Sequence, residues 1–349
     1  MRIALVVPDS QGWRSRGSAR ESERSRVLAE RLAADGHEVR VFCTQFWPGY
    51  EQVLRHEGVA YHGVTVAPAR TSFTARLPAL LARYGPDVVQ TAPRPASVVL
   101  GARAGARLAR SPLVVGWTDE VPPGGRLARR AATAPDGALV PSELVGRRVM
   151  EYGTPDDRVR RVPQAVDCER VRAVDPDPTY DVVAATPLDE DANLDSLLLA
   201  LAELRDRDWS ALVVGSGAGR AGVADQLDSL RIADRVTLAG DLSRDERLAY
   251  YRGAHVFVQT RRHVSFAREL LWVLVAGCVG VVEYQGGSSA HELVERRERG
   301  VRVTSPEELE AVIAGASDRE RRDYDPTFER YDWERVLAEH LEFYRELGA

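Results

Sequence analysis

The sequence contains no lysine, so its 47 fixed positive side chains are all arginine. Without a lysine amine, catalysis through a lysine Schiff base is excluded. Cysteine is also scarce, because Cys43, Cys168 and Cys278 are scattered and form no CxxC pair. We therefore expect neither a disulfide framework nor a structural zinc site.

A surplus of charge of one sign is lacking as well. The net charge is −5, and acidic and basic residues are interspersed along the chain. No basic face for nucleic acid is expected from such a pattern. A hydrophobic content of 44% indicates a compact globular protein rather than a disordered one.

Long hydrophobic runs are absent too. The longest, residues 270–282, is shorter than the ~20 residues that span a bilayer, and it contains Gly277 and Gly280. The apolar run 3–7 at the N-terminus stops at Pro8, too early for a secretory signal. We expect a cytoplasmic protein without a transmembrane segment.

What the sequence does contain is a repeated alternation of short apolar runs with amphipathic stretches. In the first half the strand-like runs are 2–7, 39–43, 87–90, 113–117 and 138–140. In the second half they are 181–185, 211–215, 236–239, 256–259 and 279–283. This alternation is typical of βαβ units, and it predicts an α/β protein with two parallel sheets.

The length of 349 residues favours two domains of similar size. The helix-breaking stretch 175–178, Asp-Pro-Asp-Pro, predicts a linker at 171–180 between domains at 1–170 and 181–328. Residues 329–349 form an amphipathic C-terminal helix in this prediction. Because ligands bind beyond the carboxyl ends of parallel strands, two sheets facing one another predict a ligand site in an interdomain cleft.

Several short segments share their order and approximate spacing with a known family. In the first half these are residues 28–39, 85–89 and 163–167. In the second half they are residues 213–217, 234–240, 249–258, 275–277, 286–287, 292–294 and 331–335. On these segments the chain resembles family 4 of the GT-B glycosyltransferases over most of its length.

The resemblance implies a GT-B fold, in which two Rossmann-like domains face an interdomain cleft. The second domain would bind a nucleotide-sugar donor and the first a glycan or lipid-linked acceptor, and the last helix would cross back to the first domain. It also implies transfer with retention of configuration and without a metal or other cofactor. The oligomeric state stays open.

The chain departs from this family at the positions that normally do the chemistry. The family's Arg and Lys, which neutralise the donor phosphates, correspond to Pro187 and Ala192. Its two Glu residues, which contact the donor sugar and the ribose, correspond to Val264 and Trp272. An alternative function is therefore a catalytically impaired relative that serves as a binding or scaffold subunit.

The predicted donor site lies on strand-end loops of the second domain. Its residues are Gly215, Gly217, Gly240, Arg261, Arg262, His263, Phe266, Arg268, Glu269, Gly286 and Gly287. We hypothesise that Arg261, Arg262 and Arg268 replace the missing cations, beside a helix that begins near Phe266 with Ser265 as its N-cap. The alternative is a solvated loop whose arginines pair with Glu269 and neighbouring acids.

In the first domain, Asp119 follows a predicted strand and is the candidate catalytic residue. Its carboxylate would bind an acceptor hydroxyl or act as a base, and the alternative is a cap for the turn at 121–123.

Residues 13–31 are dense in arginine. Such a run is typical of a solvated helix face, and the alternative is contact with an anionic lipid surface, which would place the protein peripherally at the inner face of the membrane.

Overall fold

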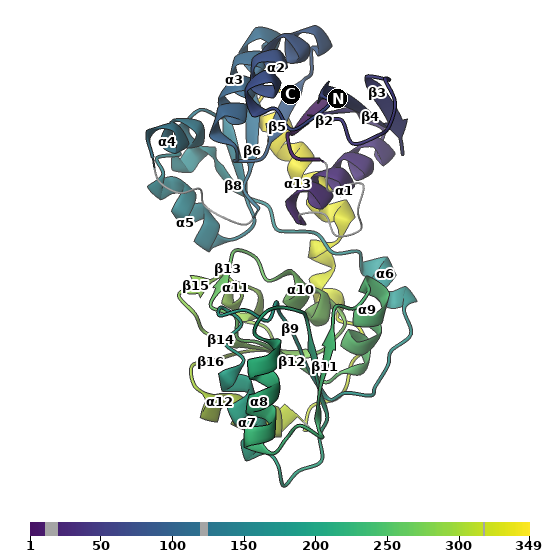
Figure 1. Ribbon diagram of the computed structural model, residues 1–349, viewed down its shortest axis with the longest axis vertical. Helices are drawn as coiled ribbons and strands as arrows, with labels where there is room; N and C mark the ends of the chain where they lie inside the picture. The colour runs from purple at the N-terminus through teal and green to yellow at the C-terminus, as the bar shows by residue number, and fades with distance from the viewer. Residues whose placement is uncertain (11–19, 119–124, 317) are drawn as a thin grey trace. The chain divides into compact units, whose positions relative to one another are not determined.

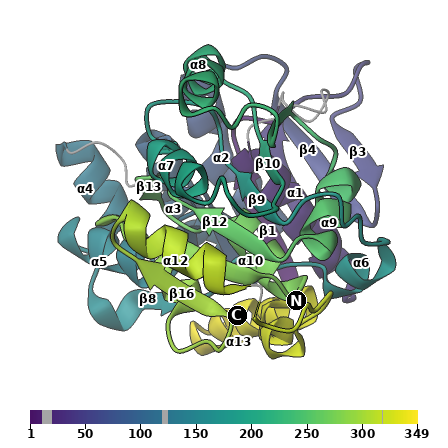
Figure 2. The same cartoon turned by 90° about the horizontal axis from the view of Figure 1, so that it is seen from below.

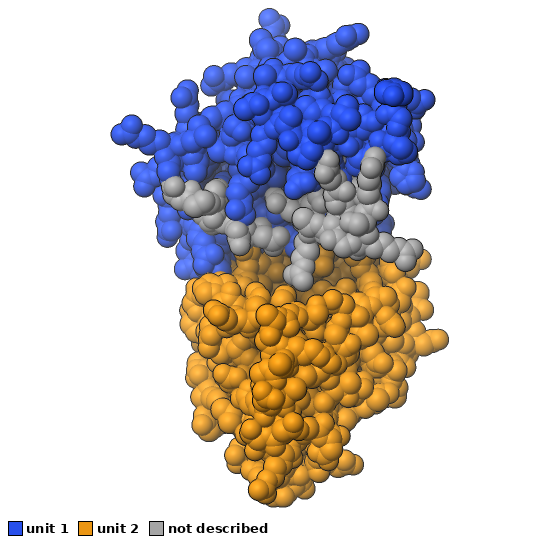
Figure 3. Space-filling view, viewed as in Figure 1, with its two compact units in different colours: residues 1–163, 337–349 blue, residues 164–336 orange. Residues whose placement is uncertain are grey.

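The computed structural model describes residues 1–10, 20–118, 125–316 and 318–349. The chain forms two compact units, one of residues 1–163 with 337–349 and the other of residues 164–336 (Figure 3). The polypeptide thus passes from one unit to the other twice. The first passage lies before the predicted linker at 171–180, part of which is helical in α6 (Cys168–Ala173).

Unit 1 is built on a sheet whose described strands run in the order β3-β4-β2-β1-β5-β6-β7-β8 (Figure 1). These strands are β1 (Arg2–Val7), β2 (Glu38–Thr44), β3 (Val53–His56), β4 (Val59–Thr65), β5 (Val88–Thr91), β6 (Leu113–Gly116), β7 (Gly137–Val140) and β8 (Val159–Arg161). Only β3 is antiparallel to its neighbour among these. The helices are α1 (Arg20–Ala34), α2 (Arg70–Tyr84), α3 (Ala96–Ala109), α4 (Arg126–Thr133), α5 (Glu143–Glu151) and the end of α13 (Trp333–Glu346).

The central strands of unit 1 are buried on both faces. In β1, Ala4 and Val6 join the core formed with α2 and α3, whereas Ile3 and Leu5 point to the opposite face and are equally buried. Side chains alternate along a strand, so a strand covered on both sides must be apolar throughout. This requirement explains why the sequence of β1 is a continuous apolar run.

Unit 2 contains a second sheet, in the order β11-β10-β9-β12-β14-β16, and all its pairs are parallel. Its strands are β9 (Val182–Ala185), β10 (Ala211–Val214), β11 (Val236–Gly240), β12 (Val256–Gln259), β14 (Val279–Glu283) and β16 (Gly300–Val303), and β13 (His263–Val264) pairs with β15 (Gly287–Ser288). Its helices include α7 (Asp195–Glu203), α8 (Arg220–Leu230), α9 (Arg244–Gly253), α10 (Arg268–Val275), α11 (His291–Val294) and α12 (Pro306–Ala316). The order is that of a doubly wound Rossmann fold, and it reverses between β9 and β12.

Two cores fill the two faces of this sheet. Val182 and Ala184 point into the core that contains α7 and α12, and Val183 and Ala185 point into the core that contains α9 and α10. Helices α7 and α8 lie next to each other in both views (Figures 1 and 2). Unit 2 is therefore a three-layer α/β/α structure.

The predicted α/β class with two parallel sheets is confirmed, and each predicted strand overlaps an observed strand. The predicted C-terminal helix is α13. Strands β3, β4, β8 and β16 and the short pair β13–β15 were not predicted. Among the described helices, none is long and apolar enough to cross a bilayer.

Two helical glycines of unit 2 provide a matched test of its packing. A Cβ atom on Gly253, at the end of α9, would lie 1.8 Å from the carbonyl oxygen of Asp177, whereas one on Gly222 in α8 would meet nothing within 4 Å. We expect Gly253→Ala to lower the free energy of unfolding by about 2 kcal/mol or more, because backbone must move. Gly222→Ala is expected to raise it by about 0.5–1 kcal/mol. Urea unfolding of both variants checks this, and equal effects would contradict the packing described.

Candidate functional site

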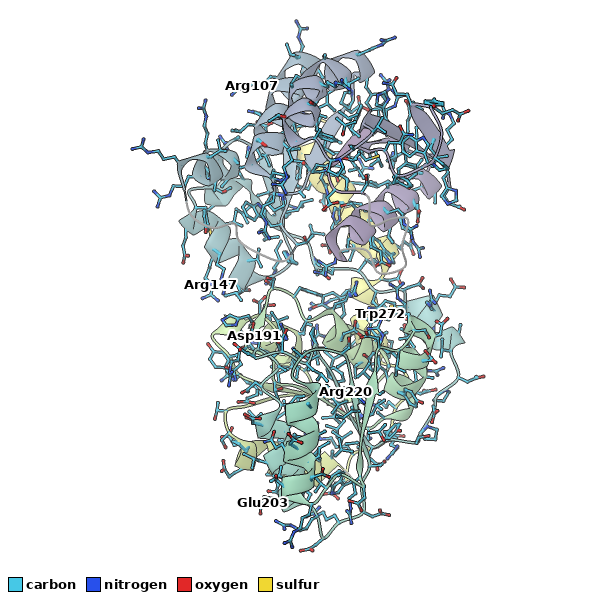
Figure 4. All side chains as sticks on the ribbon, in the orientation of Figure 1. Arg107, Arg147, Asp191, Glu203, Arg220 and Trp272 are labelled. Atoms are coloured by element: carbon cyan, nitrogen blue, oxygen red, sulfur yellow. The ribbon has the colours of Figure 1, made fainter. Side chains whose placement is uncertain are left out.

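The candidate site lies at the carboxyl end of the unit 2 sheet, where the strand order reverses. The loop after β9 (186–194) and the loop after β12 (260–267) meet there, because these strands are neighbours. Figure 4 labels Asp191 of the first loop and Trp272 of α10 at the same end of unit 2, and Glu203 at its opposite end. Parallel sheets bind ligands at such a point of reversal.

An ion pair joins the two loops. Nη1 and Nη2 of Arg261 lie 2.7 Å and 3.0 Å from the two carboxylate oxygens of Asp189, a bidentate arrangement. The hydrogen bond from Arg261 is the main cause that lowers the pKa of Asp189. The guanidinium of Arg261, predicted as a phosphate ligand, is therefore bound to a carboxylate of its own chain.

The next two residues extend this pairing. Arg262 donates to the carbonyl oxygen of Glu190 (3.0 Å) and to Oδ1 of Asn193 (2.8 Å). Nδ1 of His263 lies 2.8 Å from Oδ1 of Asp191. We call residues 186–193 and 260–263 the paired loops, since each basic side chain of the second segment contacts the first.

Two of the predicted glycines serve the packing of these loops. A Cβ atom on Gly215 (φ +140°) would lie 2.0 Å from the carbonyl oxygen of Thr186, and one on Gly217 would lie 2.2 Å from that of Leu188. The loop after β10 can approach the loop after β9 this closely only because both residues lack a side chain. The close packing of the two loops therefore explains why both positions are glycine.

The other predicted glycines differ in their surroundings. The short strand pair β13–β15 brings Gly287 beside His263, whose ring would lie 2.6 Å from a Cβ atom on Gly287. Gly240 and Gly286 have open space where a side chain would be. These two positions leave room for a ligand near the backbone.

Helix α10 begins at Arg268, two residues later than predicted. Ser265 was expected to cap it, but the N-cap residue is Ala267, and no side chain caps the first turn. The delay has a physical reason: β13 keeps the chain extended through Val264, and the Ser289 hydroxyl donates to the carbonyl of Ser265 (2.7 Å). Phe266 is buried in the core rather than exposed to a ligand.

Arg268 and Glu269 lie in the first turn of α10 and belong to a second polar group, which we call the α9–α10 cluster. It lines a small open hollow and comprises Arg244, Arg247, Leu248, Tyr251, Arg268, Glu269 and Trp272. Within it, Glu269 accepts hydrogen bonds from the Tyr251 hydroxyl (2.8 Å) and pairs with Arg247 (2.8 Å). Burial, together with the charge of Glu269, raises the pKa of Tyr251 well above its ordinary value.

Sequence reasoning missed the α9 members of this cluster. The signal was present, because Ser243 and Glu246 form a capping box that starts α9. A helix beginning there places Arg244, Arg247 and Tyr251 on one face by their spacing of three and four residues.

Sequence reasoning also missed Glu283, at the end of β14. This side chain is 9% exposed, and Asn193 donates to it from 3.1 Å. Burial raises the pKa of the Glu283 carboxyl. The sequence contained a signal for this residue. It is a carboxyl group at the end of an apolar strand, and that strand end points to a ligand-binding edge of the sheet.

Three of the positions at which the sequence analysis expects departures from the resembled family carry apolar side chains that pack in the core of unit 2. Ala192 and Trp272 are buried, and Val264 packs against the core of unit 2. The candidate catalytic residue Asp119 lies outside the described residues, as do residues 13–19 of the arginine-rich segment. Within the described ranges, no three His, Cys, Asp or Glu side chains gather as a metal site would require.

Comparison with protein families identifies the class of protein that carries this fold and site. The model of Glycosyltransferase Family 4 matches residues 25–170, and that of glycosyl transferases group 1 matches residues 180–318. Together the two matches span most of both units. The chain therefore belongs to the group 1 glycosyltransferases of family 4, which have the GT-B fold with two Rossmann-like domains.

Solved structures share the fold over the whole chain. A glycosyltransferase from Rickettsia africae superposes with a TM-score of 0.79 at 14% identity, covering 99% of this chain and 98% of that one. Anabaena HepE in complex with UDP gives 0.77 at 15% identity, with 99% and 100% covered. Sucrose-phosphate synthase from Thermosynechococcus elongatus gives 0.75 at 16% identity, with 99% of each chain covered. None of the curated protein sequences matches the chain.

The Arg261–Asp189 pair predicts a pH-dependent contribution to stability. The folded-state pKa of Asp189 is below its ordinary value of 3.8, so the contribution is present above that value and is lost as the pH falls through the folded pKa. Because Asp189 is half exposed, we expect Asp189→Asn to cost at most about 1 kcal/mol at pH 7. In urea unfolding, the difference from wild type should shrink as the pH falls below 3.8 and vanish once Asp189 is protonated in the folded state.

The neighbouring Glu190→Gln substitution is the control for this measurement. Glu190 contacts Arg262 through its main-chain carbonyl, so its side-chain charge can be removed without disturbing that hydrogen bond. We expect a change below about 0.5 kcal/mol across the pH range, as for an ordinary surface substitution. A pH-independent effect of Asp189→Asn would contradict the ion pair.

Proposed function

We propose that this protein transfers a sugar from a nucleotide-sugar donor, bound by unit 2, to a glycan or lipid-linked acceptor. The observation that carries the proposal is the reversal of strand order between β9 and β12, with polar loops and the start of α10 gathered at that point. Family membership supports it. Anabaena HepE, which has the same fold, has been crystallised with UDP and with UDP-glucose.

The donor would lie over Gly215, Gly217, Gly240, residues 261–269 and Gly286–Gly287. When the bond between the sugar and the leaving phosphate breaks, negative charge grows on the phosphate oxygen. Guanidinium groups and the N–H groups at the start of α10 would stabilise that charge. In this proposal the transfer retains configuration and uses no metal, and Asp119 contacts the acceptor.

A second candidate function is a non-catalytic subunit that binds a ligand or a partner on the same fold. The pairing of Arg261 and Arg262 with the loop after β9 favours it, because these side chains already have acceptors. The buried Trp272 favours it too, since an indole cannot accept a hydrogen bond from a hydroxyl. The two candidates predict different outcomes of one measurement.

The test is a calorimetric and thermal-shift screen against UDP, GDP, dTDP and CDP sugars. We expect one nucleotide class to bind with a dissociation constant of about 1 µM to 1 mM, the range usual for enzyme substrates. At a hundredfold excess over that constant it should add about 2.7 kcal/mol to the free energy of unfolding.

Release of the free nucleotide is then measured with and without extracted glycans and lipids as acceptors. Acceptor-dependent release supports the transferase. Binding without release under any of these conditions supports the non-catalytic subunit, and the absence of binding to every nucleotide sugar overturns the proposed donor.

A further inference from the structure

We propose that the α9–α10 cluster, and not the paired loops, is where this protein binds the phosphate groups of its ligand. The inference rests on the proposed function, because that function makes the nucleotide part of the donor the ligand. It assigns a role to Arg244 and Arg247, which the sequence did not single out.

The geometry of two helices brings three guanidinium groups to one hollow. Arg244 and Arg247 lie one turn apart on α9, and Arg268 is the first residue of the adjacent α10. Residues three positions apart share a helix face. The side chains therefore converge from two elements on a single hollow that is open to solvent.

The charge of the lining groups is unbalanced. Glu269 is the one carboxylate among the lining residues, and its oxygens are engaged by Arg247 and by the Tyr251 hydroxyl, each at 2.8 Å. Arg268 lies 3.8 Å from Glu269, which is beyond a hydrogen bond. The lining thus holds three guanidinium groups beside one carboxylate that is already engaged, a composition that suits an anion such as a phosphate group.

Arg247 holds its charge and keeps one donor unused. Burial lowers its pKa, but the charge of Glu269 and the hydrogen bonds to Glu269 and Tyr251 raise it further, so the net shift is upward. Its Nε–H group is buried and meets no acceptor among the described residues. A buried donor without a partner is unfavourable, and a phosphate oxygen would satisfy it.

The surroundings strengthen an electrostatic interaction at this place. Trp272 and Leu248 form an apolar lining, and both are buried. The guanidinium of Arg244 lies 5.8 Å from the centre of the Trp272 ring. Apolar surroundings reduce screening by water, and the uncapped N-terminus of α10 adds a positive dipole end.

The paired loops are a weaker site for the same group. A phosphate at Arg261 would have to displace the bidentate Asp189 carboxylate and would then lie beside that negative charge. At Arg262 it would have to break hydrogen bonds to Glu190 and Asn193. No such exchange is needed at Arg268.

The experiment compares arginine variants of the full chain by calorimetry with two probes, inorganic pyrophosphate and UDP. Arg244→Gln and Arg268→Gln test the α9–α10 cluster. Arg262→Gln tests the paired loops, and Arg302→Gln, a surface residue that pairs with Glu295 at the edge of the sheet, is the charge-matched control. Circular dichroism and thermal unfolding establish that each variant is folded, and Arg247 is left unchanged because it pairs with the half-buried Glu269.

We expect Arg244→Gln and Arg268→Gln each to weaken the binding of pyrophosphate by about tenfold or more, the loss of one charge-assisted hydrogen bond. Arg262→Gln and Arg302→Gln should change it by less than about twofold, the size expected for a charge without direct contact. UDP should follow the same order. This pattern in folded variants supports the inference.

Three other outcomes are informative. Weakening by Arg262→Gln, with Arg244→Gln and Arg268→Gln unaffected, overturns the inference and leaves the proposed function intact. Binding of pyrophosphate that depends on the cluster, without binding of any nucleotide sugar in the screen, supports the phosphate site and overturns the proposed donor. Failure of both probes to bind the wild-type chain overturns the inference.

Discussion

The reversal of strand order between β9 and β12 is the constraint on which the structure of unit 2 depends. Connections between parallel strands are right-handed, so a chain that moves outward in opposite directions from the centre places its helices on opposite faces. This is why α7 and α8 cover one face and α10 and α11 the other. The loops that follow β9 and β12 leave neighbouring strand ends and meet there, and polar residues of the candidate site are found on them.

The central strands could be predicted from the sequence because burial on both faces demands unbroken apolar runs, as in β1 and β9. Except for β4, which is buried along nearly all its length, the strands that were missed lack this pattern for a physical reason. Strands β3, β8 and β16 lie at sheet edges and carry exposed charges such as Arg55, Arg161 and Arg302. The pair β13–β15 has two residues on each side, too few to show any period.

The location of the candidate site could be predicted from the sequence, but the partners of its charged side chains could not. The polar segment 261–263 and the start of α10 come directly after a strand. The local pattern of apolar and polar residues is enough to predict that position. The partners of Arg261 and Arg262 are about seventy residues away along the chain, in the loop after β9. Similarly, Glu269 pairs with Arg247 and Tyr251 of the preceding helix, a contact that depends on how α9 packs against α10. Such contacts depend on tertiary structure, and the spacing of residues along the sequence does not predict them.

The position of the C-terminal segment affects the order in which the two units can complete their folding during synthesis. Residues 337–349 belong to unit 1, and they bring the buried Phe343 and Tyr344 into it. The whole of unit 2 is one continuous stretch of chain, whereas unit 1 is made of the first and the last parts. During synthesis the N-terminal part leaves the ribosome first but lacks this closing segment until all of unit 2 has been made. Unit 2 can therefore complete its core before unit 1 does, although its residues are made later than most of those of unit 1.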